Sequence, residues 1–406
     1  MKPSSARPSP LSRRSLLAAS AATALLMLPG CGGGGDGGSA GVGTGGTGSF
    51  TSGPIRGFGS IVVNGVRYDD AAAQVVGDGG AALARSALRL GMVVDVSGSD
   101  VSTATDGRRS ATATSIGVRS EIEGPVSAIN AAAGTLTVLG QLVQITPTTV
   151  FDHDLRGGLA AVAVGMVVEV YGFLQPSGQY LATRIDDEDD PVTHYKLRGV
   201  VSGLDTAART FRIGTALVSY ADIAASVSGL ANGQYARVEL QLTPDASGAW
   251  RARSIRLATT AIGMPAGDGV KAEIEGYITA FTSDARFSVA GIVVDASAVG
   301  QLPPGLAVGR RVEVEGVLSA GVLVARSVEF EDDDDDDDEF EIEGVITSVS
   351  ASARTFSVRG ITVNYANARF KDGTAEQLAP GVKVEVEGQL ASDGTTLLAT
   401  EVEFDN

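Results

Sequence analysis

The chain contains one cysteine, Cys31, and two histidines, His153 and His194, in 406 residues. A lone cysteine excludes an intramolecular disulfide, even in an oxidising compartment. Two histidines far apart in the sequence, without cysteine support, make a poor transition-metal site. We expect each histidine to lie at a turn or on the surface, and we expect no cofactor.

Basic residues are also scarce, with 31 Lys and Arg against 48 Asp and Glu. Removal of the N-terminal signal described below would take away four basic residues and leave 27 against 48. Proteins that bind nucleic acid or anionic lipid headgroups need a basic footprint. The composition therefore argues against nucleic acid as a partner.

Familiar catalytic motifs are absent: the chain has no Gly-x-Ser-x-Gly elbow, no His-Glu-x-x-His and no Walker loop. Paired carboxylates, which a glycosidase needs, occur as Glu121 with Glu123, Glu273 with Glu275, and Glu341 with Glu343. Each pair lies at i and i+2 on a strand face that we expect to be solvated, and it recurs in three modules, which favours a structural role. An enzyme is the less favoured class.

Residues 1–30 have the features of an export signal. Arg7, Arg13 and Arg14 precede an apolar run at residues 16–28, which is too short to span a bilayer. The stretch at residues 12–17 resembles the twin-arginine signal of folded-protein export. We expect this segment to be cleaved.

The sequence Leu28-Pro29-Gly30-Cys31 looks like the lipobox of bacterial lipoproteins, in which the cysteine is acylated and becomes the first residue. We therefore expect lipid attachment at Cys31 and a location in the bacterial cell envelope, on a membrane that faces the periplasm, such as the outer membrane. An idle thiol and an uncleaved signal are the alternatives. The glycine-rich residues 31–53 are expected to form a flexible tether.

A pattern recurs five times along the chain: a first strand with a glycine, a tight hairpin, a Leu-x-x-Gly turn, and a strand resembling Val-Glu-Val-Glu-Gly. We assign the first-strand glycines to Gly57, Gly124, Gly199, Gly276 and Gly344, which lie 67, 75, 77 and 68 residues apart. The repetition predicts five modules, at residues 54–118, 119–190, 193–258, 270–331 and 340–406.

Side chains within each module alternate with the period of a half-buried strand. In the last module the alternation predicts that these residues face inward: Val382, Val384, Val386, Leu398, Thr400, Val402 and Phe404. Two-residue connections such as Asn64-Gly65 and Arg359-Gly360 suit primed hairpin turns.

Five short strands, of which the first can bend at its glycine, predict a small closed barrel with the inserted helical turn of an OB-fold. The fold class that we predict is all-β, with five tandem small OB-like β-barrel modules in a beads-on-a-string array. A propeller or solenoid is the competing architecture.

Two acidic runs, at residues 186–190 and 331–339, are expected to be extended spacers between modules, because like charges repel. Weak calcium binding is the alternative, although neither run has the spacing or turn glycine of an EF-hand.

The stretch at residues 56–69, the repeated Glu-Ile-Glu-Gly and Val-Glu-Val-Glu-Gly, and the glycine tether after Cys31 together resemble a bacterial lipoprotein family of tandem uncharacterised domains, the domain of unknown function 5666 type. The resemblance covers nearly all of residues 53–404. It implies an exported envelope protein made of small β-barrels, and it implies no activity or site residues. The third module departs most from the pattern.

The third module also differs in charge, with eight basic and four acidic residues between positions 193 and 258. Aromatic and arginine side chains on an OB-like barrel can bind an oligosaccharide or another anionic ligand. The candidate binding residues are Tyr195, Arg198, Tyr220, Tyr235, Trp250, Arg251 and Arg253. The alternative is that the aromatic residues fill the core and the arginines pair with acidic linkers.

The sequence thus predicts a non-enzymatic envelope lipoprotein that binds or scaffolds, with a membrane and a glycan or other envelope component as partners. The alternative is an envelope enzyme or periplasmic assembly factor with a site between modules.

Overall fold

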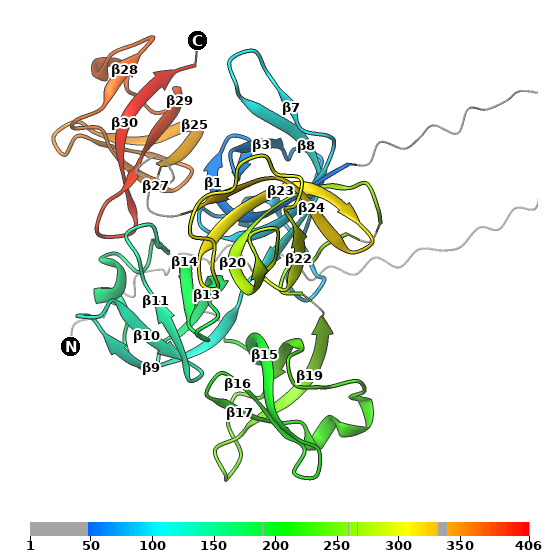
Figure 1. Cartoon of the computed structure of the whole chain (residues 1–406). Helices are drawn as coiled ribbons and strands as arrows, with labels where there is room; N and C mark the ends of the chain where they lie inside the picture. The colour runs from blue at the N-terminus through cyan, green and yellow to red at the C-terminus, as the bar shows by residue number, and fades with distance from the viewer. Residues whose placement is uncertain (1–47, 189–190, 259, 266, 332–338, 406) are drawn as a thin grey trace, which may run out of the picture. The chain divides into compact units, whose positions relative to one another are not determined.

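The computed structural model describes residues 48–188, 191–258, 260–265, 267–331 and 339–405 (Figure 1). The expected signal, the lipobox with Cys31, most of the tether and the acidic run at residues 332–338 lie outside the described residues. The regular structure of the described residues consists of strands and four short 3-10 helices, so the all-β prediction is confirmed.

For description, the chain is divided into five segments at residues 48–118, 119–188, 191–258, 267–331 and 339–405. The first contains β1 (Ser49–Phe58), β2 (Ile61–Val63), β3 (Val66–Asp69), β4 (Gln74–Val76), β5 (Ala82–Leu83), η1 (Arg85–Ala87), β6 (Val93–Gly98), β7 (Ser102–Thr103) and β8 (Arg109–Arg119). The second contains β9 (Ile122–Asn130), β10 (Thr135–Val138), β11 (Gln141–Gln144), β12 (Val150–Phe151), η2 (Gly158–Ala161), β13 (Val167–Leu174) and β14 (Tyr180–Asp187).

The other three segments follow the same plan. The third contains β15 (Tyr195–Asp205), β16 (Thr210–Ile213), β17 (Ala216–Ser219), η3 (Ala221–Ser226), β18 (Tyr235–Leu240) and β19 (Trp250–Ala258). The fourth contains β20 (Lys271–Ser283), β21 (Arg286–Val289), β22 (Ile292–Asp295), β23 (Arg311–Ser319) and β24 (Val322–Phe330). The fifth contains β25 (Glu339–Ser350), β26 (Thr355–Val358), β27 (Ile361–Asn364), β28 (Arg369–Lys371), η4 (Ala375–Gln377), β29 (Lys383–Leu390) and β30 (Thr396–Phe404).

Hydrogen bonding closes the strands of the fifth segment into a ring. β25, β26 and β27 pair in antiparallel order, β27 pairs with β30 in parallel, and β30 and β29 return to β25. The first half of β25 pairs with β29 and its second half pairs with β26, so one strand serves both edges, as expected from its central glycine. The four other segments close in the same cyclic order.

The strand register corrects one assignment from the sequence. Gly124 and Gly344 lie opposite the first valine of the Val-Glu-Val strand, at Val168 and Val384. In the first segment the residue in this position is Gly53, opposite Val94, and Gly57 lies four residues later. β1 accordingly begins at Ser49, before the predicted module boundary and inside the expected tether. Two glycines four residues apart made the sequence ambiguous.

The hairpin prediction is confirmed. Asn64, Leu139, Ala290 and Arg359 have φ angles of 48°, 49°, 50° and 51°, and each is followed by a glycine with positive φ. These are the left-handed conformations that a primed two-residue turn requires. The turns fix the register of the second and third strands of each ring.

The last strand of each ring carries a bulge that reverses its alternation. In β30, Ala399 pairs with Gly388 and Glu401 pairs with Glu387, which leaves Thr400 as an extra residue. Leu398 is therefore 44% exposed and Thr400 is exposed, while Val402 and Phe404 face inward. The predicted inward set was wrong for Leu398 and Thr400, because an uninterrupted period of two cannot anticipate this phase change.

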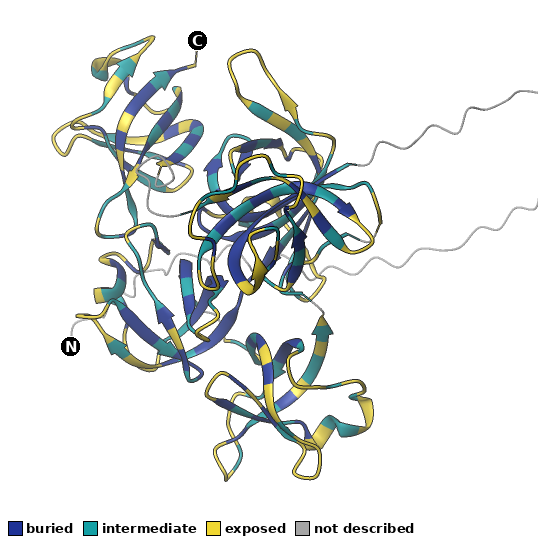
Figure 2. Cartoon of the chain, viewed as in Figure 1, coloured by how far each residue is buried: buried dark blue, intermediate teal, exposed yellow. Residues whose placement is uncertain are grey.

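The inner faces of the rings form the buried core (Figure 2). In β29, Val384 and Val386 are fully buried and alternate with partly or fully exposed Lys383 and Glu385. Backbone pairing also joins different segments: β1 pairs with β20 over Ser49–Ser52, and β9 pairs with β15. Such shared sheets differ from the predicted beads on a string, because the first half of β1 and of β9 pairs with its own ring along one edge and with another segment along the other edge.

Candidate functional site

The paired glutamates of the second and fourth segments are buried. Glu121, Glu123, Glu273 and Glu275 are at most 7% exposed. The solvated strand face predicted for them is therefore wrong in these two segments. They lie on the outer side of the ring, away from inward residues such as Ile122, but other side chains cover them.

The glutamates of the first strand meet further carboxylates on the neighbouring strand. Glu123 on β9 lies opposite Glu169 on β13, and in the fourth segment Glu273 and Glu275 on β20 lie opposite Glu315 and Glu313 on β23. The fifth segment repeats the arrangement with Glu341 opposite Glu387 and Glu343 opposite Glu385. We call these outward carboxylates of the first and fourth strands of the ring the glutamate ladder.

Like charges that face each other across two strands are destabilising unless a counter-charge lies between them. In the second segment this charge is Lys196 of β15, whose Nζ lies 3.0 Å from a Glu169 oxygen and also forms an ion pair with Glu123. Burial opposes the charge of Lys196, but Glu169 and Glu123 together raise its pKa. The lysine therefore stays protonated.

Arginines of the first segment lie against the glutamate ladder of the fourth and fifth segments. Arg109 of β8 donates to Glu273, with Nη1 at 3.0 Å from Oε1, and lies 3.9 Å from Glu315. Arg67 of β3 forms an ion pair with Glu341 and places Nη2 at 3.0 Å from Glu385 Oε1. Sequence reasoning missed both arginines, because nothing near them in the chain marks their distant partners.

Burial changes the protonation of two ladder carboxyls. It raises the pKa of Glu313 to about 11, with further contributions from Glu273 and Glu331. Burial and a hydrogen bond with Glu385 raise the pKa of Glu341 to about 8. At neutral pH Glu313 is thus a neutral acid. Raised carboxyl pKa values also occur in catalytic acids. Arg67 lies against Glu341, whereas the side chain of Glu313 is hydrogen-bonded with Glu273.

The aromatic residues proposed for the third segment do not form one open face. Tyr220 and Tyr235 are 8% and 7% exposed, and the Tyr235 hydroxyl donates to Glu121 Oε2 at 2.7 Å. Tyr195 and Trp250 are half-buried and form an edge-to-face pair with ring centroids 5.8 Å apart. This placement favours the alternative in which the aromatic residues belong to the core and its margin.

The three arginines of the same prediction have different surroundings. Arg198 is largely buried and forms an ion pair with Asp78. Arg251 pairs with Asp222 at 2.7 Å, and the exposed Arg253 donates to the Thr193 carbonyl at 2.6 Å. Two of the three predicted arginines are therefore already paired with aspartates.

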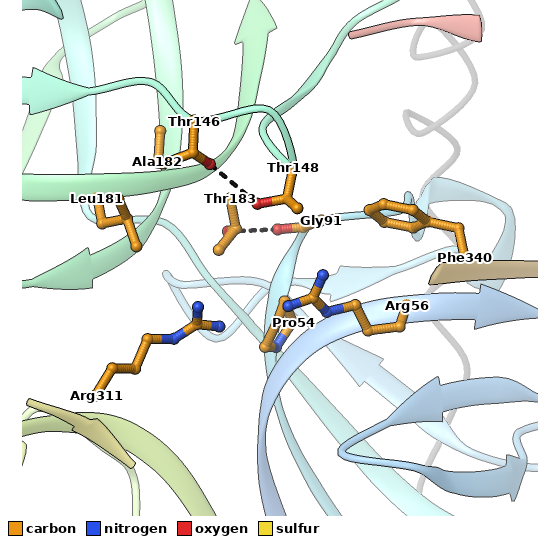
Figure 3. A pocket seen from close by; sticks show the side chains of 10 residues that line it. All are labelled: Pro54, Arg56, Gly91, Thr146, Thr148, Leu181, Ala182, Thr183, Arg311 and Phe340. Carbon is orange, nitrogen blue, oxygen red and sulfur yellow. Dashed lines mark hydrogen bonds between the residues drawn. The ribbon is translucent and has the colours of Figure 1, made fainter. Parts of the chain in front are cut away.

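A small cavity lies where Arg56 of β1 and Arg311 of β23 extend toward Thr146, Thr148 and Thr183 (Figure 3). Its volume is about 10 Å³, which is room for one water molecule at most. Arg311 already pairs with Glu275 and lies 5.1 Å from the centre of the Phe173 ring. The cavity is too small to bind an organic substrate.

A larger polar groove, of about 380 Å³, lies on the first segment. Its lining includes hydroxyl and carboxylate side chains, among them Ser60, Ser102, Ser110, Asp69 and Asp100. No aromatic side chain lines it, so a sugar there would have only polar contacts.

His153 lies at an exposed turn, as predicted, between Asp152 and Asp154. Its Nδ1 lies 2.6 Å from Asp152 Oδ1, and Asp152 also pairs with Arg184 at 3.3 Å. These contacts satisfy Asp152 without an ion. His194 lies in a half-buried bend.

Part of the first acidic run belongs to a strand. Asp186 and Asp187 end β14, and Asp186 is buried with an Oδ1 2.6 Å from Arg184 Nη2. The spacer prediction is wrong for these two residues, because an arginine of the same strand neutralises the charge. Residues 189–190 lie outside the described residues.

Comparison with protein-family models matches three regions, residues 123–186, 275–329 and 343–403, to a domain of unknown function, DUF5666. They fall in the second, fourth and fifth segments, which carry the glutamate ladder. No curated protein matched the chain. Across the described part of the chain, no helix has the length and apolar character needed to cross a membrane. Three regions of the chain therefore match the DUF5666 model, which describes a repeated domain without known function.

Proposed function

We propose that this protein is a non-enzymatic lipoprotein of the bacterial cell envelope, in which five OB-like modules on a lipid-anchored tether form a scaffold or binding surface. The cyclic strand order, with a parallel pair between the third and fifth strands of each ring, supports the OB-like assignment. The segment at residues 28–31 supports the lipid anchor at Cys31.

The observation that carries the non-enzymatic proposal is the occupation of the paired carboxylates. A glycosidase needs two acids on either side of a cleft that admits a sugar. Lys196, Arg109 and Arg67 instead lie against the glutamates of three segments. The acids that recur most regularly in the chain thus hold the protein together.

The second candidate function is an envelope enzyme or assembly factor whose site lies between modules. The elevated pKa of Glu313, at about 11, is the observation that favours it, because a neutral carboxyl can serve as a general acid. A turnover screen of the purified chain on glycosides and esters separates the two. Turnover that Glu313→Gln abolishes would overturn the non-enzymatic assignment.

Anchoring is tested in cells with Cys31→Ala. We expect the variant to move from the membrane to the soluble fraction and to lose incorporation of radiolabelled palmitate. Stable retention of the wild type needs more than one acyl chain, since one chain binds only marginally. Ser39→Ala, in the same glycine-rich stretch, is the matched control and should stay with the membrane. Unchanged labelling and fractionation of Cys31→Ala would refute the lipid anchor.

A further inference from the structure

In three segments, one basic side chain from a different segment bridges carboxylates on two neighbouring strands. Lys196 reaches Glu123 and Glu169, and the arginines of the first segment reach Glu273 with Glu315 and Glu341 with Glu385. The donors are 27 and 73 residues from their partners in the first bridge and more than 160 residues away in the two others. The bridged glutamates face each other in the second and fourth segments and are diagonal neighbours in the fifth.

The third segment repeats the contact with opposite charge. The register places Lys196 and Arg198 of β15 opposite Glu239 and Arg237 of β18, at the positions of the ladder. Arg198 thus faces Arg237, where the other segments have facing glutamates. Asp78, in the turn between β4 and β5, accepts from both: its carboxylate from Arg198 and its backbone carbonyl from Arg237.

We propose that the outward positions of the first and fourth strands, where two side chains of like charge face each other, are the docking site by which one OB-like module recognises another. The sign of these two charges selects the partner. The glutamates bridged by Lys196, Arg109 and Arg67 take a lysine or arginine from another module, whereas Glu275 pairs with Arg311 of its own segment. The facing arginines of the third segment take an aspartate. This inference rests on the scaffold function proposed above and names the surface that builds the scaffold.

The physical basis is the cost of an unmatched pair. Two facing charges of the same sign repel each other, and burial adds a desolvation cost to each. A single opposite charge between the two side chains offsets both the repulsion and the desolvation cost, whereas a neutral or like-charged partner offsets neither. Buried ion pairs contribute little net stability but discriminate strongly between partners. The ladder therefore contributes mainly to the choice of the module that docks, and only a little to the stability of each module.

A second argument concerns the nature of the occupant. The bridging groups lie within hydrogen-bond distance of the carboxylates, as with Lys196 Nζ and Glu169 at 3.0 Å, so they occupy the position that a metal ion would take. Among the described residues, the one group of His, Cys, Asp or Glu side chains arranged to share an ion is Asp152-His153-Asp154, outside the ladder. A basic side chain of another module is thus the partner that fits.

The bridge between Arg109 and Glu273 gives the sharpest test, because it joins two segments through residues that are 164 positions apart in the sequence. Three full-length variants are compared with the wild type: Arg109→Glu, Glu273→Arg, and the double variant with both changes. In the double variant the new arginine again lies between two acids, at positions 109 and 315. Arg286→Glu, an exposed charge reversal on β21 of the same segment, is the matched control.

The readout is the distance between the first and fourth segments, measured by electron–electron resonance of spin labels. Removing the single native cysteine with Cys31→Ser allows specific labelling at Thr105→Cys and Thr282→Cys, both at exposed positions. The wild type and the Arg286→Glu control should give one narrow distance distribution. Each single variant at the bridge should broaden it, and the double variant should restore it.

Hydrogen exchange of β20 and β23 in each variant shows whether the fourth segment is folded, and Arg109→Gln serves as a milder change should Arg109→Glu disturb the first. A distribution that stays narrow in Arg109→Glu and Arg109→Gln overturns the proposal. So does a broadened distribution that the double variant fails to restore. Either result leaves the anchoring and turnover tests untouched, so failure of the docking site is distinct from failure of the scaffold function.

Discussion

The bulge in the last strand gives the most direct test of why four of the five rings carry a glycine opposite it, at Gly98, Gly172, Gly316 and Gly388. A Cβ at Gly388 would lie 2.2 Å from the Leu398 carbonyl oxygen and 2.9 Å from Ala399 Cα. Both atoms belong to the backbone of the paired strand, so the contact is relieved only if the two strands separate locally. The backbone of Gly388 does not require glycine for its φ angle, so the effect of a substitution comes from this contact alone.

We expect Gly388→Ala to destabilise the fifth segment by about 2 kcal/mol, the middle of the range for an added methyl group in a packed site. The oxygen contact has to lengthen by roughly 1 Å, which the strands achieve by separating at the bulge. Complete unfolding is not expected, because Leu240 stands at the same place in the third segment and the bulge is kept there.

The assay is hydrogen exchange of peptides from β29 and β30 in the intact chain, because a global melt averages over several segments. A loss of 2 kcal/mol should lower protection roughly 30-fold. Gly117→Ala is the matched control: it lies in β8, where a Cβ would meet its nearest atom at 3.8 Å. The control should be neutral or slightly stabilising. Protection of Gly388→Ala within twofold of the wild type would refute the reasoning.

Two further predictions concern the ladder and the autonomy of a ring. The folded pKa of Glu313, about 11, exceeds its ordinary value of 4.5, so the folded state binds more protons between these values and its stability falls as pH rises through this window. Glu313→Gln should therefore raise the hydrogen-exchange protection of β20 and β23, relative to the wild type at the same pH, more at pH 9 than at pH 5. An unchanged pH dependence would contradict the burial of this acid. Residues 340–406, expressed alone, should fold as a β domain with dispersed amide resonances, because their ring closes on itself. An unfolded fragment would show that the fifth segment needs the first segment to complete its core, since both contribute side chains to one hydrophobic cluster.

Local sequence rules determined the strands, the turns and their repetition. The hairpin at Arg359-Gly360 follows from φ requirements within two residues, and the alternation of Val384 and Val386 follows from the geometry of a single strand. Such signals involve neighbours in the chain, so they can be recognised without a fold. The all-β class and the small rings followed from them.

Only the tertiary structure decided the features that depend on which strands meet. The extra residue Thr400 and the equivalence of Gly53, not Gly57, to the other first-strand glycines appear only in the register between strands. The burial of Glu273 depends on Arg109, which the chain brings from another segment. The sequence by itself shows the recurring glutamates. Their surroundings arise from contacts between residues more than a hundred positions apart. Because of these contacts, glutamates that the alternation predicts to be solvated are buried between segments.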